Sequence, residues 1–298
     1  MQALADLHRH LDGSLRDATL RELARPLGVE VPPLAELQFH TGMGLSGALQ
    51  RFAVTLAVLQ EPAALRRVAD ECCQDARAEG VTTLELRFAP QLHGDIARAI
   101  DAVLEGLDGR AGLILCALYG EDPQILDELV RCGASRPGVV GIDLAAGPSP
   151  EHRFQMKDYA AGFARAADAG LGRTVHAGEG RPPEEIRTAI EVLGAQRIGH
   201  GTTLLQDPSV VELVLARGVT IEACLTSNFN IGAIASVAAH PLPRWLALGI
   251  SACVCADNTL FSATDAAREH ALARALPGMT EPHFAAVVAA GHAAAFRR

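Results

Sequence analysis

Short apolar runs recur along the chain, and segments with a helical pattern separate them. The runs resemble buried strands and cover residues 4–11, 81–88, 113–118, 139–144, 173–176, 197–200, 219–224 and 250–256. In the segments between them, apolar residues return every three or four positions, as on the buried face of a helix. These segments are residues 96–107, 123–132, 154–169, 183–193, 208–216 and 242–248. The chain is therefore expected to alternate between strand and helix.

Such alternation predicts a parallel sheet with right-handed crossovers. Eight units in about 250–300 residues favour an α/β fold of the closed (β/α)8 TIM barrel type, with a doubly wound open sheet as the alternative. No G-x-G-x-x-G motif directly follows an early strand, which argues against a dinucleotide-binding sheet. Helical patterns at 17–27, 48–59 and 62–79 predict a helical insertion after strand 1. No linker, repeat or low-complexity tract is found, so we expect residues 1–298 to form one domain.

The composition narrows the classes of partner. The 298 residues carry a formal net charge of −9, which argues against an extended nucleic-acid surface. Aromatic residues make up 4% of the chain, too few for base-stacking platforms. No apolar stretch approaches the ~18 residues that cross a membrane, and the first residues lack the basic start of a signal peptide. We therefore expect a cytoplasmic protein that binds neither nucleic acid nor a membrane.

Unusual polar residues stand where several predicted strands end. They are His8 and His10 on the first strand, His176 on the fifth with Glu179 just beyond it, His200 on the sixth, and Asp257 with Asn258 after the eighth. Taken alone, each has an ordinary explanation, such as a core histidine for His8 or a helix N-cap for Asp257. Barrel enzymes build their sites at the carboxyl ends of the strands. The set together therefore predicts an active site at that rim.

Three histidines and an aspartate offer the nitrogen and oxygen ligands that suit Zn²⁺, namely His8, His10, His176 and Asp257. An ion with an open coordination position binds water and lowers its pKa to about 7. His200, which the ion does not need as a ligand, is a candidate to take the water's proton. Glu179 is a candidate acid for the electrophile. Iron or manganese also accepts such ligands, so zinc is a preference among these metals.

Five motifs in the same order resemble those of the adenosine deaminase family of the amidohydrolase superfamily. They are H-R-H-L-D-G-S at residues 8–14, V-V-G-I-D-L-A at 139–145, V-H-A-G-E at 175–179, R-I-G-H-G at 197–201 and T-S-N at 226–228. The motifs run from residue 6 to about residue 265, nearly the whole chain. The H-x-H-L-D-G opening together with H-A-G-E and I-G-H-G makes the resemblance specific.

The resemblance implies a (β/α)8 barrel that holds one zinc ion at its rim and deaminates an adenine nucleoside. The implied metal ligands are His8, His10, His176 and Asp257. Glu179 would protonate the purine N1, and His200 would orient and deprotonate the attacking water, which Asp257 would share. Water would attack C6, a tetrahedral intermediate would form, and ammonia would leave.

The resemblance also implies substrate contacts from His10, Asp12, Gly147 and Asn258. Asp12 would contact the ribose 5′-hydroxyl, a backbone amide near Gly147 would face N3, and the helical insertion, including Phe52, would cover the base. The family usually has a second aspartate where this chain has Asn258. An asparagine amide donates a hydrogen bond to N7 at any pH. The usual A-G-D-E after strand 4 reads A-A-G-P-S here, at residues 145–149.

These departures leave the exact substrate open. Adenosine is the first expectation, and free adenine, an N6-substituted purine or 6-amino-6-deoxyfutalosine are alternatives. The carboxylate of the last would want a cation, for which Arg51, Arg87 and Arg153 are candidates, although surface salt bridges suit each of them better. AMP is less favoured because no basic cluster adjoins the motifs.

Two further alternatives come from other functional classes. A non-catalytic nucleoside-binding relative is expected to lack Glu179 or His200, and both are present. A barrel hydrolase of esters or lactams is the weaker enzyme alternative. The sequence does not determine the oligomeric state.

Overall fold

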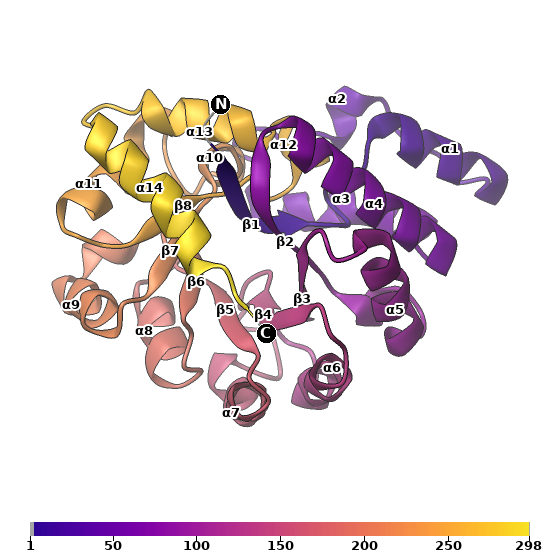
Figure 1. The fold of residues 1–298 in the computed structure, drawn as a ribbon, viewed down its shortest axis with the longest axis horizontal. Coiled ribbons are helices and arrows are strands. Elements are labelled where there is room, and N and C mark those ends of the chain that lie inside the picture. Colours follow the sequence, from indigo (N-terminus) through magenta and orange to yellow (C-terminus); the bar gives the residue numbers. More distant parts are fainter. Residues whose placement is uncertain (1–2, 298) are drawn as a thin grey trace.

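The computed structural model describes residues 3–297, and within them eight parallel strands form one sheet surrounded by helices (Figure 1). The strands are β1 Leu4–His10, β2 Val81–Phe88, β3 Gly112–Leu118, β4 Val139–Ala145, β5 Gly172–Ala177, β6 Arg197–His200, β7 Thr220–Ala223 and β8 Ala252–Val254. They pair in chain order from β1 to β8. Nearly every strand residue is buried, as expected for a parallel sheet covered by helices. The predicted (β/α)8 TIM barrel is confirmed.

The barrel closes between β8 and β1 through the residue that follows β8. The N–H of His10 donates to the carbonyl oxygen of Asp257 at 2.9 Å, and the N–H of Asp257 donates to that of His8 at 2.8 Å. These two bonds form a parallel bridge between Arg9 and Asp257. β8 itself is shorter than the predicted strand 250–256, yet this bridge continues the pairing to the rim. The closure therefore fixes Asp257 against both histidines of β1.

Helices connect the successive strands on the outside of the barrel. The connecting helices are α5 Ile96–Leu107, α6 Pro123–Ala134, α7 Ala160–Asp168, α8 Glu184–Glu191, α9 Pro208–Arg217 and α11 Leu242–Ala247, with 3₁₀ turns η1 Pro90–Leu92, η2 Met156–Tyr159, η3 Leu204–Gln206 and η4 Val237–Ala239. Their starts follow ordinary capping rules: the Asp95 and Asp207 carboxylates accept hydrogen bonds from backbone N–H groups in the first turns of α5 and α9. The predicted helix 154–169 divides into η2 and α7. The other five predicted crossovers agree to within a few residues.

The predicted insertion after β1 is present as four helices. They are α1 Asp17–Leu27, α2 Leu34–Leu37, α3 Gly44–Val58 and α4 Pro62–Ala78, of which α4 also packs on β2. Aromatic rings tie the insertion to the segment after β8. The Phe39 ring stacks on Phe261 at 5.1 Å between centroids, and Phe52 meets the same ring edge-on at 4.8 Å. The insertion is thereby held over the rim where the strands end.

The sequence did not predict four of the helices in the last third of the chain. They are α10 Leu225–Asn230, α12 Thr259–Ser262, α13 Ala266–Arg274 and α14 Glu281–Ala294. α14 packs on β8 and β1, where an ideal Cβ on Gly291 would lie 2.8 Å from the Cβ of Ala5. Figure 1 shows α14, in yellow, running across this part of the barrel. α14 thus covers the outside of the junction at which the barrel closes.

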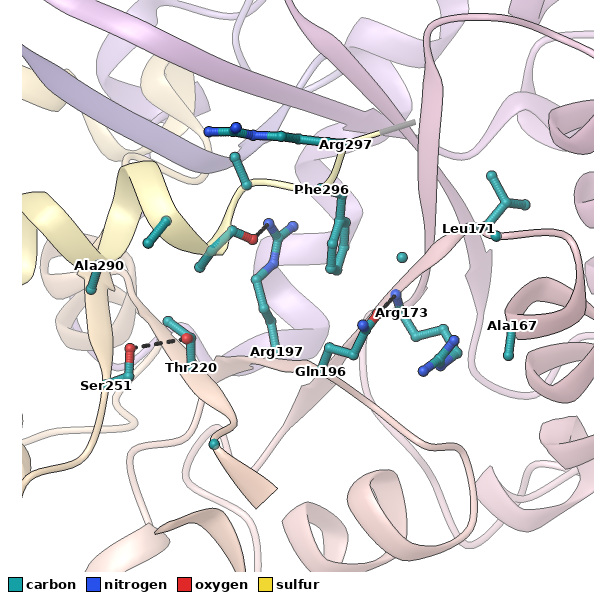
Figure 2. A pocket seen from close by; sticks show the side chains of 16 residues that line it. Ala167, Leu171, Arg173, Gln196, Arg197, Thr220, Ser251, Ala290, Phe296 and Arg297 are labelled. Atoms are coloured by element: carbon teal, nitrogen blue, oxygen red, sulfur yellow. Dashed lines mark hydrogen bonds between the residues drawn. The ribbon is translucent and has the colours of Figure 1, made fainter. Parts of the chain in front are cut away.

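The chain after α14 closes over the first residues of β5 and β6 (Figure 2). The guanidinium of Arg197 lies 3.7 Å from the centre of the Phe296 ring, and the Phe296 N–H donates to Glu85. Gly172 makes room for the ring, because an ideal Cβ there would lie 2.1 Å from its Cγ. A cavity of about 570 Å³ adjoins this closure. Among residues 3–297, no helix is long and apolar enough to span a membrane.

Candidate active site

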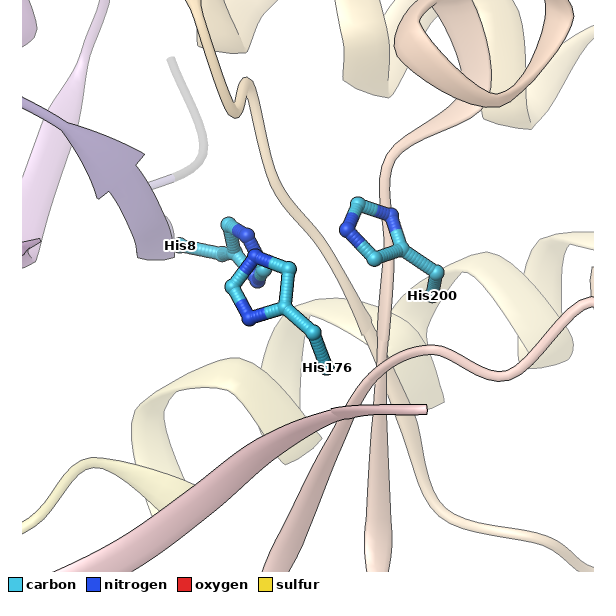
Figure 3. Close-up of side chains that lie close together, drawn as sticks. All are labelled: His8, His176 and His200. Atoms are coloured by element: carbon cyan, nitrogen blue, oxygen red, sulfur yellow. The ribbon is translucent and has the colours of Figure 1, made fainter. Parts of the chain in front are cut away.

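The carboxyl ends of β1, β5, β6 and β8 bring the predicted site residues together. His8 and His10 lie on β1, His176 on β5 and His200 at the end of β6, while Asp257 follows β8. Figure 3 shows the rings of His8, His176 and His200 facing one another. The His8 ring centroid lies 4.6 Å from that of His176 and 5.0 Å from that of His200. Residues separated by up to 249 positions thus meet at one point.

Four of these side chains present ligand atoms to a common space. Nε2 of His10 lies 3.3 Å from Nε2 of His176 and 3.5 Å from Oδ1 of Asp257. Nε2 of His8 lies 3.7 Å from the same Oδ1 and is buried without a hydrogen-bond partner. A buried nitrogen without a partner is costly unless a metal or another group occupies the space before it. Three imidazoles and one carboxylate are a donor set that fits Zn²⁺.

Two buried carboxylates orient the histidines from behind. Nδ1 of His8 lies 2.6 Å from Oε2 of Glu222, and Nδ1 of His176 lies 3.0 Å from Oδ2 of Asp143. A carboxylate on Nδ1 fixes the tautomer that leaves Nε2 free to bind a metal. The sequence interpretation gave Glu222 and Asp143 no role. Each places a charge in the middle of an apolar strand, and Asp143 also belongs to the motif at residues 139–145.

Arg87 connects these two carboxylates. Its Nη1 donates to Asp143 at 2.8 Å and its Nη2 donates to Glu222 at 2.9 Å, with all three side chains fully buried. The suggestions of a surface salt bridge or of a substrate cation for Arg87 are therefore wrong. The guanidinium lies beneath the site, where its positive charge offsets the negative charges of the two carboxylates, and it is not available to a substrate.

Glu179 and His200 form a second cluster at the edge of the ligand set. Oε1 of Glu179 lies 3.3 Å from Nδ1 of His200, and the side-chain amide of Asn228 lies 3.0 Å from the same nitrogen. Burial raises the pKa of Glu179 to about 7, although the nearby Arg181 guanidinium partly opposes this rise. Burial lowers the pKa of His200 well below its ordinary value. A carboxyl group that keeps its proton below about pH 7 and a neutral imidazole thus lie side by side.

Strained backbone marks the same rim. His200 has φ of 73°, Asp257 has φ of 60° and Ala146 has φ of 66°, all in the left-handed region. Residues other than glycine rarely adopt this region, and when they do they cluster at functional sites. The conformation sets the direction in which the His200 and Asp257 side chains leave the ends of their strands.

The residues predicted to contact substrate lie in two adjoining cavities. A small one of about 60 Å³ includes His10, Phe52, Glu179, His200 and Asn258 in its lining. A larger one of about 670 Å³ includes His10, Phe52, Asp12 and Gly147. The structure therefore brings Asn258 to the reacting groups but separates it from Asp12 and Gly147, while His10 and Phe52 border both spaces.

Asn258 is held tightly in the small cavity. Its Nδ2 donates to Oδ1 of Asp257 at 2.7 Å, and its Oδ1 is buried without a partner. Gly13 packs directly against it, because an ideal Cβ on Gly13 would lie 1.8 Å from that Oδ1. The amide nitrogen carries two hydrogens, so one N–H remains for a ligand.

Comparison with known proteins agrees with the geometry. The family model described as adenosine deaminase matches residues 3–297. The chain is 35% identical over 298 residues to an adenosine deaminase of Serratia proteamaculans, covering 93% of this chain and 89% of the relative. It is also 35% identical over 289 residues to a probable adenosine deaminase of Dictyostelium discoideum, of which it covers 37%.

The fold comparison gives the same family. The crystal structure of an adenine deaminase from Arthrobacter aurescens superposes with a TM-score of 0.90 at 27% identity, over 100% of this chain and 95% of that one. The resemblance seen in the sequence motifs is confirmed. The chain belongs to the adenosine deaminase family and is a metal-dependent aminohydrolase that acts on a purine.

Proposed function

We propose that this protein converts adenosine to inosine and ammonia with one zinc ion held by His8, His10, His176 and Asp257. The observation that carries the proposal is the convergence of these four ligand atoms beside a Glu179 carboxyl group whose pKa is raised to about 7. Hydrolytic deamination requires a nucleophilic water, a base that takes its proton and an acid that activates the ring.

The ligand set supports zinc as the metal. Nε2 of His8 has no hydrogen-bond partner, and carboxylates hold Nδ1 of both His8 and His176. Both features are typical of histidines that bind a metal through Nε2. Zinc lowers the pKa of a bound water to about 7, which makes that water a nucleophile near neutral pH. Iron and manganese are the alternatives for the same donor set.

We assign the proton transfers to Glu179 and His200. Nδ1 of His200 lies 3.3 Å from Oε1 of Glu179 and 3.0 Å from Nδ2 of Asn228, and we assign the proton of the attacking water to this imidazole. Glu179 gives its proton to N1 of the purine, which makes C6 electrophilic. The water oxygen bonds to C6. The C6–N6 bond then breaks as His200 returns a proton to the departing ammonia. The remaining hydroxyl proton passes to the Glu179 carboxylate, which restores the acid and leaves a 6-oxopurine.

We assign substrate positioning to the groups that line the two cavities. The free N–H of Asn258 would donate to N7, while Phe52 would cover the base. Asp12, whose Oδ1 is buried without a partner, would accept a hydrogen bond from the ribose. Asp257 would contact the attacking water as well as the metal. A backbone N–H near Gly147 would meet N3 at the border of the two cavities.

The size of the larger cavity favours a nucleoside over free adenine. A volume of about 670 Å³ beyond the reacting groups would stay unfilled by a base alone. The presence of both Glu179 and His200, in contact, supports an enzyme over a non-catalytic nucleoside-binding relative. We further propose that residues 1–298 act as one domain. The cytoplasmic location remains a prediction.

Ammonia release from a panel of purines tests this proposal. The purified protein, with its metal content measured, is given adenosine, 2′-deoxyadenosine, adenine, AMP, N6-methyladenosine and 6-amino-6-deoxyfutalosine. We expect adenosine to exceed adenine and AMP by at least about 100-fold in kcat/KM, which corresponds to about 2.7 kcal/mol of transition-state binding. Zinc-loaded protein that releases ammonia from none of them would contradict the proposal.

A further inference from the structure

The larger cavity extends well beyond the space that a ribose needs. It shares His10, Leu45, Leu49, Phe52 and Ala146 with the small cavity that holds Glu179 and His200. A nucleoside whose base reaches Glu179 therefore directs its sugar into the larger space, past Asp12. A volume of about 670 Å³ lies in the range of about 300–1,000 Å³ that accommodates a whole drug-sized ligand. Space thus remains beyond the 5′ carbon.

Apolar side chains from three different elements line this cavity: Leu56 of α3, Leu92 of η1, and Cys116 and Leu118 of β3. Ala89 and Ala145 fill the space between them and pack with Cys116 in one buried cluster. Tyr119 also lines the cavity, but its hydroxyl already donates a hydrogen bond to the carbonyl oxygen of His176 at 2.8 Å. The polar residues of the lining besides His10, Asp12 and Tyr119 are Ser46, Gln50, Ser149 and His152.

No lysine or arginine lines this space among the residues that the structure describes, and Asp12 is the one acid in the lining. The histidines of the lining are His10 and His152. Arg181 is not part of the lining; its Nη1 would lie 2.6 Å from an ideal Cβ on Gly147, and its Nε is bonded to both carboxylate oxygens of Glu185 at 3.0 and 2.9 Å. A phosphate or carboxylate entering the cavity would lose hydration without meeting a guanidinium or ammonium group, which is unfavourable.

The other candidate cations are not available to a ligand there. Arg87 is fully buried and bonded to Asp143 and Glu222. Neither Arg51 nor Arg153 is in the lining, and the guanidinium of Arg153 lies over the Phe154 ring, 5.0 Å from its centre. No arginine or lysine is therefore available in this lining for the carboxylate of 6-amino-6-deoxyfutalosine, in the part of the chain that the structure describes.

We propose that the cavity beyond Asp12 is a subsite for an uncharged, apolar group on the 5′ carbon of an adenine nucleoside, such as a 5′-alkylthio group. This inference rests on the proposed deamination of adenine nucleosides and narrows its substrate class. The chemistry at C6 is unchanged, so the product is the corresponding 5′-substituted inosine together with ammonia.

Four substrates that differ only at the 5′ carbon test the subsite: adenosine, 5′-deoxyadenosine, 5′-deoxy-5′-methylthioadenosine and AMP. We expect the methylthio compound to exceed 5′-deoxyadenosine about tenfold in kcat/KM, because it buries two more apolar heavy atoms. We expect AMP to fall at least about 100-fold below adenosine, because its phosphate meets no lysine or arginine in the lining.

Two outcomes overturn the inference, and they are distinguishable. If adenosine is deaminated while the methylthio compound is no better than 5′-deoxyadenosine, the subsite is wrong and the proposed function stands. If none of the four substrates releases ammonia from zinc-loaded protein, the proposed function fails and the subsite fails with it.

Leu118→Trp and Leu92→Trp, made in parallel, locate the subsite. Each would fill the apolar wall, so we expect the kcat/KM ratio of the methylthio compound to adenosine to fall at least about tenfold. Leu248→Trp is the matched control, since Leu248 is 51% exposed and does not line either cavity. An unchanged ratio in folded Leu118→Trp and Leu92→Trp proteins would refute the assignment.

Discussion

Glu222 accepts a hydrogen bond from Nδ1 of His8 at 2.6 Å, in the fully buried interior of the barrel. The same carboxylate oxygen accepts from Arg87 at 2.9 Å, and its other oxygen accepts from Thr174 at 3.0 Å. Glu222 is thus saturated with donors on the side away from the cavity. The arrangement holds the His8 ring with Nε2 directed at the proposed metal position.

Glu222→Gln should weaken zinc binding. The amide has the size of the carboxylate but not its charge, so His8 becomes a poorer ligand, and losses of about 10- to 100-fold in metal affinity are typical of such changes. Competition with a chromophoric chelator measures the dissociation constant. Glu269→Gln is the matched control, because Glu269 is 1% exposed and accepts a hydrogen bond from Thr264 at 2.7 Å without touching a proposed ligand. Equal zinc affinity of the two variants would remove the supporting role from Glu222.

Glu179→Gln should keep its zinc and lose activity. The amide cannot deliver a proton to N1, and removal of a general acid costs about 100- to 10,000-fold in rate. Single-turnover rates and metal analysis of the same preparation check both halves of the prediction. Glu184→Gln, an exposed change nearby on α8, should leave both unchanged. Near-normal rates in Glu179→Gln would show that another group is the acid.

The rate should decline as the pH rises through neutrality. Burial raises the pKa of Glu179 to about 7, and the group can act as an acid only while it is protonated. The protonated fraction is high below that pKa and falls tenfold per pH unit above it, so kcat/KM should fall with the same slope. A profile of kcat/KM between about pH 6 and pH 9 measures this limb. A flat profile over that range, with stable protein, would contradict the assignment.

Gly13→Ala should disturb Asn258. The new Cβ would lie 1.8 Å from Oδ1 of Asn258, so that side chain must move and its bond to Asp257 is lost. We expect kcat/KM to fall about 10- to 100-fold. The double variant Gly13→Ala/Asn258→Ala provides the control: if Gly13 acts through Asn258, the two effects should be far from additive. Additive effects would mean that Gly13 acts by another route.

The strand ends could be predicted from the sequence because their signal is local. An apolar run that stops at His176 or His200 indicates both the strand and the residue at its end. The partners of those residues could not be predicted in this way. Glu222 and Asp143 each interrupt an apolar strand, but no local pattern says that Arg87 would join them from β2. Arg87 meets Asp143 and Glu222 only when the strands come together in the closed barrel.

The sequence did not predict α10, α12 and α14 for a related reason. α10 and α12 span only 6 and 4 residues, too short for apolar periodicity to be recognised. α14 is rich in alanine on all sides, and its buried face includes Gly291, which is recognisable only from the close approach of Ala5. The two cavities likewise depend on how α3 packs over the rim, which follows from the contact of Phe52 with Phe261.

Removal and restoration of the metal tests the central claim most directly. The protein is stripped with a chelator, and adenosine deamination is measured as zinc is added back in known amounts. The account predicts that activity disappears with the metal and returns in proportion to zinc until one ion is bound per chain. It also predicts that His10→Ala regains neither stoichiometric zinc nor activity. Full activity in metal-free protein, or stoichiometric zinc binding by His10→Ala, would contradict it.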